Sequence, residues 1–235
     1  MRKLILGLAF AGNLLVNAQE KTETKSKSPV AFGIKAGFNA TTLSHPDWQD
    51  ESVQYDGNQK IKPGFNAGIF VNIPVAEKFS IQPELLFSQK GSKSKDTYTY
   101  SDGFYGFKTE LDDKFTLNYI VLPLMVQYSI LPQLYVEAGP EFGLLLSAKS
   151  KGVNTSTEIS GSKSVTTTKN YSNKPPMEFY NKFNFGIGIG AGYYFTQNLA
   201  ATARFTAGIT DIRNMNPGGA VRNNAFQIGL AYKFK

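Results

Sequence analysis

Residues 183–195 have the sequence FNFGIGIGAGYYF, in which two kinds of side chain alternate strictly. The odd positions are apolar from Phe183 to Phe195, whereas most even positions are glycine. A period of two predicts a β-strand with one apolar face and one face of small or polar residues. Residues 225–234, AFQIGLAYKF, repeat the pattern with apolar side chains at the even positions. These two segments predict an all-β protein.

Six further segments show the same alternation. One of them, residues 114–129, is less regular because it contains Pro123, which has no backbone donor for a strand ladder. We therefore expect a bulge or a register change at Pro123. With the two segments above, the sequence predicts eight strands, the other six being residues 30–41, 64–74, 79–90, 114–129, 134–147 and 199–210.

The connections between these strands alternate between short and long. Short turns are expected at residues 75–78, 131–133 and 196–198. Short periplasmic turns and longer outer loops are typical of outer-membrane barrels. The predicted fold is an eight-stranded antiparallel up-and-down transmembrane β-barrel in the cell outer membrane, with long extracellular loops. The sequence leaves the conformation of these loops open, and they are residues 42–62, 91–113, 148–181 and 211–224.

The polar face of the predicted strands has many glycines and few charges, which are of both signs. A soluble surface usually carries roughly 25–35% charged residues, so this face is expected to line the lumen. An eight-stranded barrel has an interior that side chains fill, which argues against an open channel. We expect the charges to satisfy one another as a buried network, in preference to a gated or proton-conducting path. The expected lumen charges are Lys35, Glu84, Glu137, Glu141 and Arg204.

The N-terminal residues have the features of a secretory signal peptide. Arg2 and Lys3 precede an apolar run, and 16–18 is a small-residue cleavage motif. We expect three parts: a cleaved signal peptide (1–18), a polar linker (19–29) and the barrel domain (30–235). Cysteine is absent, so no disulfide stabilises the fold. The net charge of +7 is spread through polar segments without a basic stripe, so nucleic acid is not an expected partner.

Residues for catalysis or for metal binding are sparse. The only histidine, His45, follows Ser44 directly, and strand neighbours point to opposite faces, which makes them a poor catalytic pair. The first long loop is acidic, but it lacks the spacing and the fixed glycine of a calcium-binding EF-hand. We predict no catalytic, cofactor or metal site. The acidic residues of that loop are Asp47, Asp50, Glu51 and Asp56.

Two parts of the sequence resemble known patterns. The end of the chain, with Gln227, Gly229, Tyr232 and Phe234, resembles the C-terminal signal that the barrel assembly machinery recognises, although Lys235 follows the last aromatic residue. Four further phrases resemble the PorT-like outer-membrane β-barrel family of Bacteroidetes, which implies an eight-stranded barrel similar to OmpX and OmpA. Those phrases are residues 33–37 (GIKAG), 81–91 (IQPELLFSQKG), 117–124 (LNYIVLPL) and 135–140 (YVEAGP).

The leading functional hypothesis is a non-enzymatic surface protein whose long loops contact lipopolysaccharide and other outer-membrane lipid, or another envelope protein. Loops on a rigid scaffold commonly carry binding. Four alternatives stay open: an accessory of a secretion or assembly machine, a lipid-modifying enzyme, a small-solute pore and a soluble lipocalin-like carrier of a hydrophobic ligand. The third loop is the preferred contact surface because of its lysines, which are Lys149, Lys151, Lys163, Lys169 and Lys174.

Overall fold

The computed structural model describes residues 30–44, 54–214 and 219–234, and the backbone alone for 54–58. The expected signal peptide and linker, His45, Asp47, Asp50 and Glu51 lie outside the described residues. Within the described residues, no helix is long and apolar enough to cross a membrane. The elements are β1 (Ala31–Leu43), β2 (Gln54–Lys60), β3 (Lys62–Pro74), β4 (Phe79–Ser101), β5 (Tyr105–Ser129), β6 (Leu134–Ser160), β7 (Lys163–Asn173), the 3-10 turn η2 (Met177–Phe179), β8 (Phe183–Tyr194), β9 (Leu199–Gly208) and β10 (Asn223–Lys233).

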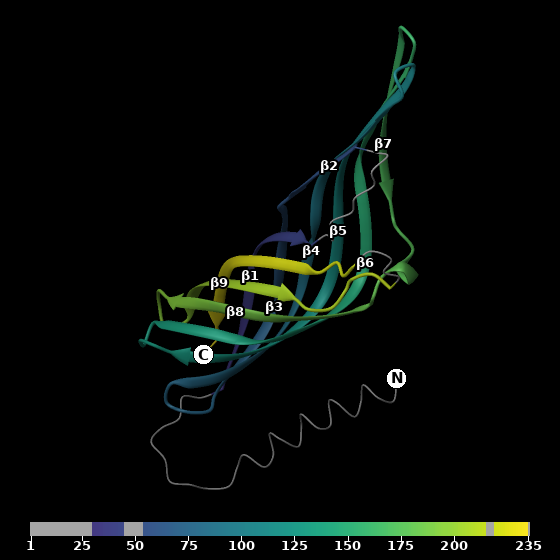
Figure 1. Ribbon diagram of the computed structural model, residues 1–235. Coiled ribbons are helices and arrows are strands. Elements are labelled where there is room, and N and C mark those ends of the chain that lie inside the picture. The colour runs from purple at the N-terminus through teal and green to yellow at the C-terminus, as the bar shows by residue number, and fades with distance from the viewer. Residues whose placement is uncertain (1–29, 45–53, 215–218, 235) are drawn as a thin grey trace.

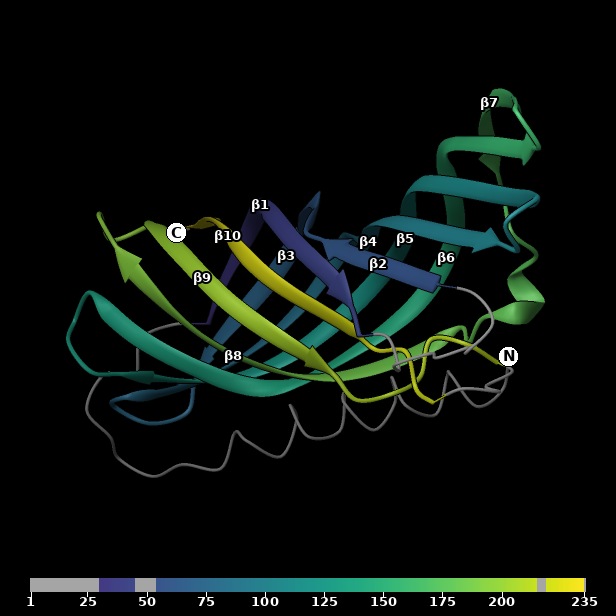
Figure 2. The same cartoon turned by 45° about the horizontal axis from the view of Figure 1, so that its top comes forward.

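Eight of the strands form a closed antiparallel ring (Figures 1 and 2). The order β1-β3-β4-β5-β6-β8-β9-β10 returns to β1, because β1 pairs with β10 from Gly33↔Lys233 to Leu43↔Asn223. The Phe234 amide also donates to the Phe32 carbonyl at 2.8 Å. Closure gives the backbone groups of the ring strands partners within the sheet, which a lipid environment requires. The predicted eight-stranded barrel is confirmed.

The ladder between β5 and β6 contains one irregularity, and it is not at Pro123. The register is the same on both sides of that proline, from Pro123↔Glu141 to Val126↔Ala138. The shift lies between Asn118 and Tyr119, where Leu146 is the extra residue on β6. The expectation of a register change at Pro123 was therefore wrong. A missing donor removes one ladder bond, but it does not by itself insert a residue.

Two of the expected long loops are largely β-structure. Strands β4 and β5 continue as a hairpin up to Ser101↔Gly106, and β6 turns at its far end into β7. Together with β2, which pairs with β4 from Gln54↔Thr99 to Lys60↔Lys93, these extensions form a sheet beyond the ring. We name it the projecting sheet: β2, residues 93–101 of β4, 105–114 of β5, 149–160 of β6, and β7. It rises from the side of the ring opposite the short turns and the C-terminus (Figure 1).

The two faces of the ring differ as the alternation predicts. The side chains of Phe32, Ile34 and Phe38 are exposed on the outside, whereas Lys35 and Asn39 on the same strand are buried in the lumen. The same division holds around the ring, with apolar residues outside and mainly polar residues inside, apart from one buried apolar cluster. A soluble lipocalin-like carrier requires the reverse arrangement, so that alternative is excluded by the orientation of the described strands.

Candidate functional site

Arg204 lies at the centre of the lumen and binds two carboxylates. This β9 residue is 2% exposed. Its Nη1 and Nη2 donate to Glu84 Oε2 and Oε1 at 2.9 and 2.7 Å, and its Nε donates to Glu137 Oε1 at 2.7 Å. Glu84 comes from β4 and Glu137 from β6. The guanidinium group therefore connects three strands, two of them far apart in the ring, through charge-assisted hydrogen bonds.

Further residues complete this network toward the short-turn end. Lys35 Nζ lies 3.2 Å from Glu84 Oε1, which also accepts from Gln82 Nε2 at 2.9 Å. Gln127 Nε2 donates to Glu137 Oε2 at 3.0 Å, and Asn72 Nδ2 donates to Gln127 Oε1 at 2.9 Å. Two positive and two negative side chains thus lie together in a buried, hydrogen-bonded cluster. This arrangement offsets the cost of burying each charge.

The fifth expected lumen charge, Glu141, belongs to a separate pair. Its Oε1 accepts from Lys90 Nζ at 2.6 Å, and that ammonium group lies 5.8 Å from the centre of the Tyr119 ring. Asn223 Nδ2 approaches Tyr119 Oη at 3.1 Å from the far side of the lumen. The sequence prediction missed Lys90, although it has the same parity as Glu84 on β4. The alternation along β4 therefore indicated an inward-facing Lys90. The residue was missed because it is the last one of the predicted strand.

An apolar cluster fills the lumen at the end from which the projecting sheet rises. Ile212 and Val221, from the connection between β9 and β10, are buried there among strand residues. The Val221 amide donates to Asp211 Oδ1 at 3.1 Å, which joins the two described ends of this connection. The polar network and this cluster together occupy the interior, as expected for eight strands. The cluster consists of Leu43, Leu86, Leu117, Tyr119, Val121, Leu145, Ala148, Ile212 and Val221.

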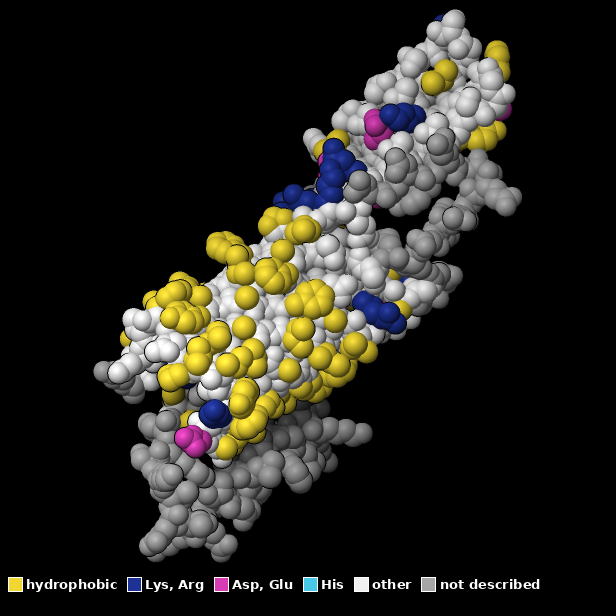
Figure 3. Space-filling model, turned by 60° about the vertical axis from the view of Figure 1, so that its left-hand side comes forward, with side chains coloured by type: hydrophobic (Ala, Val, Ile, Leu, Met, Phe, Trp, Pro, Cys, Tyr) yellow, Lys and Arg dark blue, Asp and Glu magenta, His cyan; other side chains and the backbone are white. Residues whose placement is uncertain are grey.

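The outside of the ring carries a broad band of exposed apolar side chains (Figure 3). Near the short turns, aromatic side chains contact one another in pairs, such as Phe79 with Tyr128 at a centroid distance of 4.9 Å. Tyr193 with Phe195 and Tyr232 with Phe234 form two similar edge-to-face pairs. Aromatic residues at the edges of an apolar band are typical of membrane barrels. The outer surface of this band is thus suited to lipid, and the charges of the lumen network face inward.

The comparison with protein families agrees with this arrangement. Residues 17–214 match the family described as the outer membrane protein beta-barrel domain. The chain belongs to this family. The protein is therefore located in the outer membrane, where the apolar band of the ring faces lipid.

Solved structures similar to this outer-membrane barrel include Ail, the attachment invasion locus protein of Yersinia pestis, with 12% identity and a TM-score of 0.41. Neisserial surface protein A has 13% identity and a TM-score of 0.44. In both cases 88% of this chain and all of the other chain are covered. The N-terminal barrel of Pseudomonas aeruginosa OprF has 14% identity over 89% of this chain and its own whole length, with a TM-score of 0.34. No curated protein matches the sequence.

The residues of the expected assembly signal lie on both faces of β10. Gln227 and Gly229 face the lumen, whereas Tyr232 and Phe234 are exposed on the lipid side near the short turns. The described residues contain no group of three or more His, Asp or Glu side chains arranged to hold a metal ion. The expected acidic loop residue Asp56 lies on β2, opposite Thr97.

Apolar side chains are concentrated at the far end of the projecting sheet. Phe104 is 74% exposed in the turn between β4 and β5. Its carbonyl accepts from the Gly161 amide in the turn between β6 and β7 at 2.9 Å, so the two turns are joined. The Tyr100 and Phe107 rings stack below them at 5.7 Å. We name the exposed members on the face of Phe107, together with Phe104 in the turn, the tip cluster: Tyr100, Phe104, Tyr105 and Val165. Ile159, opposite Gly106, is exposed on the other face.

Proposed function

We propose that this outer-membrane barrel is a non-enzymatic surface protein that binds another protein through the tip cluster. The observation that supports the proposal is an exposed group of aromatic and aliphatic side chains, far from the lipid-facing band, at the end of a hydrogen-bonded sheet. Exposed apolar patches usually mark interaction sites, because water disfavours them. Tyrosine and other aromatic residues are enriched at the centres of protein interfaces.

The rigidity of the projecting sheet strengthens this proposal. Its strands are paired in an unbroken ladder up to Ser101↔Gly106 and Ser160↔Lys163. Cross-strand hydroxyl pairs support the outermost hairpin, including Thr157 with Thr166 at 3.0 Å. A surface held in one conformation loses less entropy when it binds than a flexible loop does. The sheet therefore presents the tip cluster in a form that is ready for a partner.

A truncation that removes the tip tests whether the barrel folds independently of the proposed binding surface. Asp96, Leu111, Asn154 and Lys169 lie side by side in one row across the sheet. Replacing 97–110 and 155–168 each by Asn-Gly closes both hairpins just above that row, since Asn-Gly favours a two-residue hairpin turn. We expect the truncated barrel to reach the outer membrane and to keep its gel-mobility shift on heating, because the ring is unchanged.

The partner is detected by photo-crosslinking in intact cells, with the crosslinking residue at Val165. The same residue placed at Phe195, in the lipid-facing band, is the control. We expect a discrete protein adduct at Val165 that disappears when Phe104 is changed to Ser, and no such adduct at Phe195. If Val165 gives no protein adduct, or an adduct that the Phe104→Ser change leaves intact, the tip cluster is not the binding surface.

The identity of the crosslinked protein also tests the alternative of an accessory role in a secretion or assembly machine. A component of a secretion or assembly machine would support that role. A protein from outside the cell would support binding at the cell surface.

A further inference from the structure

Four lysines form a row across the base of the projecting sheet. Lys60 on β2 lies opposite Lys93 on β4, Lys93 lies opposite Lys114 on β5, and Lys114 lies opposite Lys151 on β6. Because neighbouring strands are roughly 4.8 Å apart, the row spans about 14 Å. We name it, together with Lys149 two residues below Lys151, the lysine belt.

The belt lies on the same face as the lipid-facing band. Directly opposite residues in an antiparallel pair share a face, and residues two apart along a strand also share one. On β4, every second residue from Lys93 toward the ring shares its face, and these residues include Gln89 and Phe87. On β5, the residues that share the face of Lys114 include Asn118 and Ile120. Leu117 and Tyr119, at the alternate positions of β5, are buried inside. The lysines therefore face outward.

Between the belt and the apolar band lies a row of amide and hydroxyl groups. Gln89 Nε2 donates to Asn118 Oδ1 at 3.2 Å, and Asn118 Nδ2 donates to Ser147 Oγ at 2.9 Å. Below it, Phe87 and Ile120 lie opposite each other in the apolar band. The outer surface thus changes over a few residues from apolar to neutral polar to basic. A membrane surface has the same sequence of layers, from hydrocarbon to headgroups.

The described side chains provide the belt with little countercharge. Asp112, one row above, is bound to Lys95 at 3.5 Å. Asp113 points to the opposite face, where it accepts from Ser150 and from Tyr171 at 2.6 Å. The proximity of Lys151 lowers the pKa of Lys149 below its usual value. Like charges placed directly opposite destabilise a sheet. Among the described residues, the row therefore lacks the anions that would offset its like charges.

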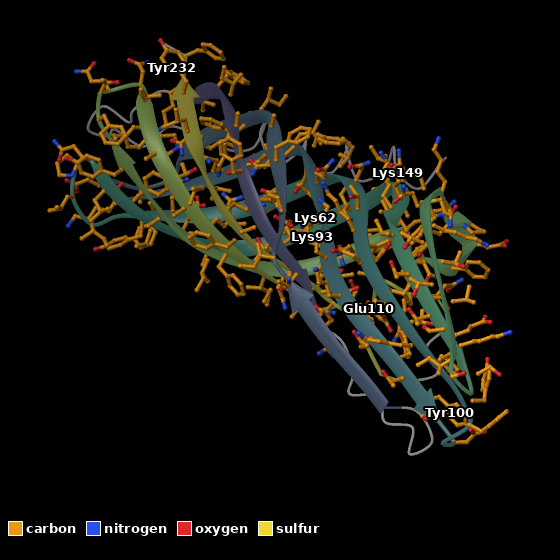
Figure 4. The ribbon with its side chains drawn as sticks, turned by 90° about the horizontal axis from the view of Figure 1, so that it is seen from above. Lys62, Lys93, Tyr100, Glu110, Lys149 and Tyr232 are labelled. Atoms are coloured by element: carbon orange, nitrogen blue, oxygen red, sulfur yellow. The ribbon has the colours of Figure 1, made fainter. Side chains whose placement is uncertain are left out.

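We propose that the lysine belt binds the phosphate groups of a phosphorylated lipid in the outer leaflet, of the lipid A type. The ligand is at the membrane surface because the belt continues the lipid-facing side of β4, β5 and β6. Figure 3 shows basic side chains at the upper edge of the hydrophobic band. In Figure 4, Lys93 and Lys149 lie between Tyr232 at the barrel end and Tyr100 at the tip. The inference is independent of the tip cluster.

The test uses the full barrel in a neutral detergent, with native mass spectrometry to count bound lipid. The probes are diphosphorylated lipid A and the same lipid after both phosphates are removed. The variant K93Q/K114Q/K151Q is compared with K78Q/K163Q/K169Q, which loses the same charge from exposed sites outside the belt. Each basic residue near an anionic surface contributes roughly a fivefold factor to affinity, so the belt variant is expected to bind about a hundredfold more weakly.

Each further measurement supports or overturns the proposal. The conservative K93R/K114R/K151R variant should retain binding, and a heat-induced gel shift shows that every variant is folded. Inorganic phosphate as competitor separates the two sources: displacement at millimolar concentration would overturn the lipid assignment in favour of a free anion. Equal binding of the dephosphorylated lipid, or equal weakening in both triple variants, would also overturn it.

Discussion

Arg204 and Glu84 are 120 residues apart in the chain, yet their side chains form a two-point ion pair across the lumen, with donor–acceptor distances of 2.9 and 2.7 Å. Both side chains are almost completely buried. The pair joins β9 to β4, strands that are not neighbours in the ring. It therefore acts as a crosslink through the interior, where the low dielectric strengthens it and also makes an unpaired charge costly.

The first prediction concerns the removal of this guanidinium group. Arg204→Met leaves the buried carboxylates of Glu84 and Glu137 without their main partner, and should lower the free energy of unfolding by about 3–5 kcal/mol. Urea unfolding of the barrel in lipid vesicles measures this. Neutralising the two carboxylates in the same chain, as Arg204→Met/Glu84→Gln/Glu137→Gln, should recover part of the loss.

Lys108→Met is the control for this prediction. Its ammonium group pairs with Glu110 at 2.9 Å on the exposed surface of the projecting sheet. Exposed pairs contribute roughly 0–1 kcal/mol. If Arg204→Met lowers the free energy of unfolding no more than Lys108→Met does, the lumen network does not crosslink the barrel.

Strict alternation made the ring predictable. The parity of each strand places Lys35, Glu84, Glu137 and Arg204 on the inner face. Each strand has one apolar and one polar face, so only one orientation puts every apolar face toward lipid. Parity does not give the height of each residue in the lumen. That height depends on the stagger between strands, so the sequence could not separate the Glu84–Arg204 cluster from the Lys90–Glu141 pair.

The projecting sheet was not predictable from alternation. Neither of its faces is buried against an apolar core, so β7 has exposed residues at nearly every position and no period of two. The remaining signal was composition, since residues 153–168 of β6 and β7 are rich in threonine and valine, which favour strands. The lysine belt was equally hidden, because Lys60, Lys93, Lys114 and Lys151 become neighbours only through the register of four strands.

The second prediction concerns the space that a glycine leaves in the lumen. A Cβ added at Gly192 would overlap the ring of Tyr135, its direct cross-strand partner. Gly192→Ala should therefore destabilise the barrel by about 1–3 kcal/mol through overpacking. Gly143→Ala, also facing the lumen, is the control, because its nearest neighbours would be 3.4 Å from the new Cβ. In urea unfolding, the Gly192→Ala variant should be much less stable than the Gly143→Ala variant. Equal stabilities would contradict the packing argument.

The third prediction concerns a tyrosine in the projecting sheet. Burial, together with donation to Asp113 Oδ1 at 2.6 Å, raises the pKa of Tyr171 to about 12. The ordinary value in an unfolded chain is about 10. Because the folded pKa is the higher one, Tyr171 stabilises the sheet fully below about pH 10 and loses this contribution as the pH rises through about 12.

Ultraviolet absorbance of the phenolate is followed against pH in the original chain and in a Tyr171→Phe variant. The difference between the two titration curves belongs to Tyr171 and gives its pKa. The tyrosine that the variant lacks should titrate near pH 12 in the folded protein. Asp113→Ala should move the midpoint toward the ordinary value, because it removes the acceptor. A midpoint at the ordinary value in the unaltered folded protein would show that the Tyr171–Asp113 contact is absent.

The fourth prediction separates the assembly signal from the aromatic band. Tyr232 and Phe234 form an edge-to-face pair with a centroid distance of 5.6 Å and an interplanar angle of 70°, and Tyr193 and Phe195 form one at 5.5 Å and 71°. Tyr232 and Phe234 are 43% and 48% exposed, and Tyr193 and Phe195 are 48% and 62% exposed. The two pairs have nearly the same geometry and both are exposed on the lipid side, but only the first belongs to the residues that resemble the assembly signal.

Replacing each pair by alanine distinguishes the two roles. Both double variants should lose similar stability in lipid vesicles, since each removes two half-exposed aromatic side chains from the same face. In cells, Tyr232→Ala/Phe234→Ala should reach the outer membrane in much lower amount than Tyr193→Ala/Phe195→Ala, measured as the heat-modifiable band in the membrane fraction. Equal amounts of the two variants would mean that these aromatic residues serve only as lipid contacts, and that the assembly machinery recognises another part of β10.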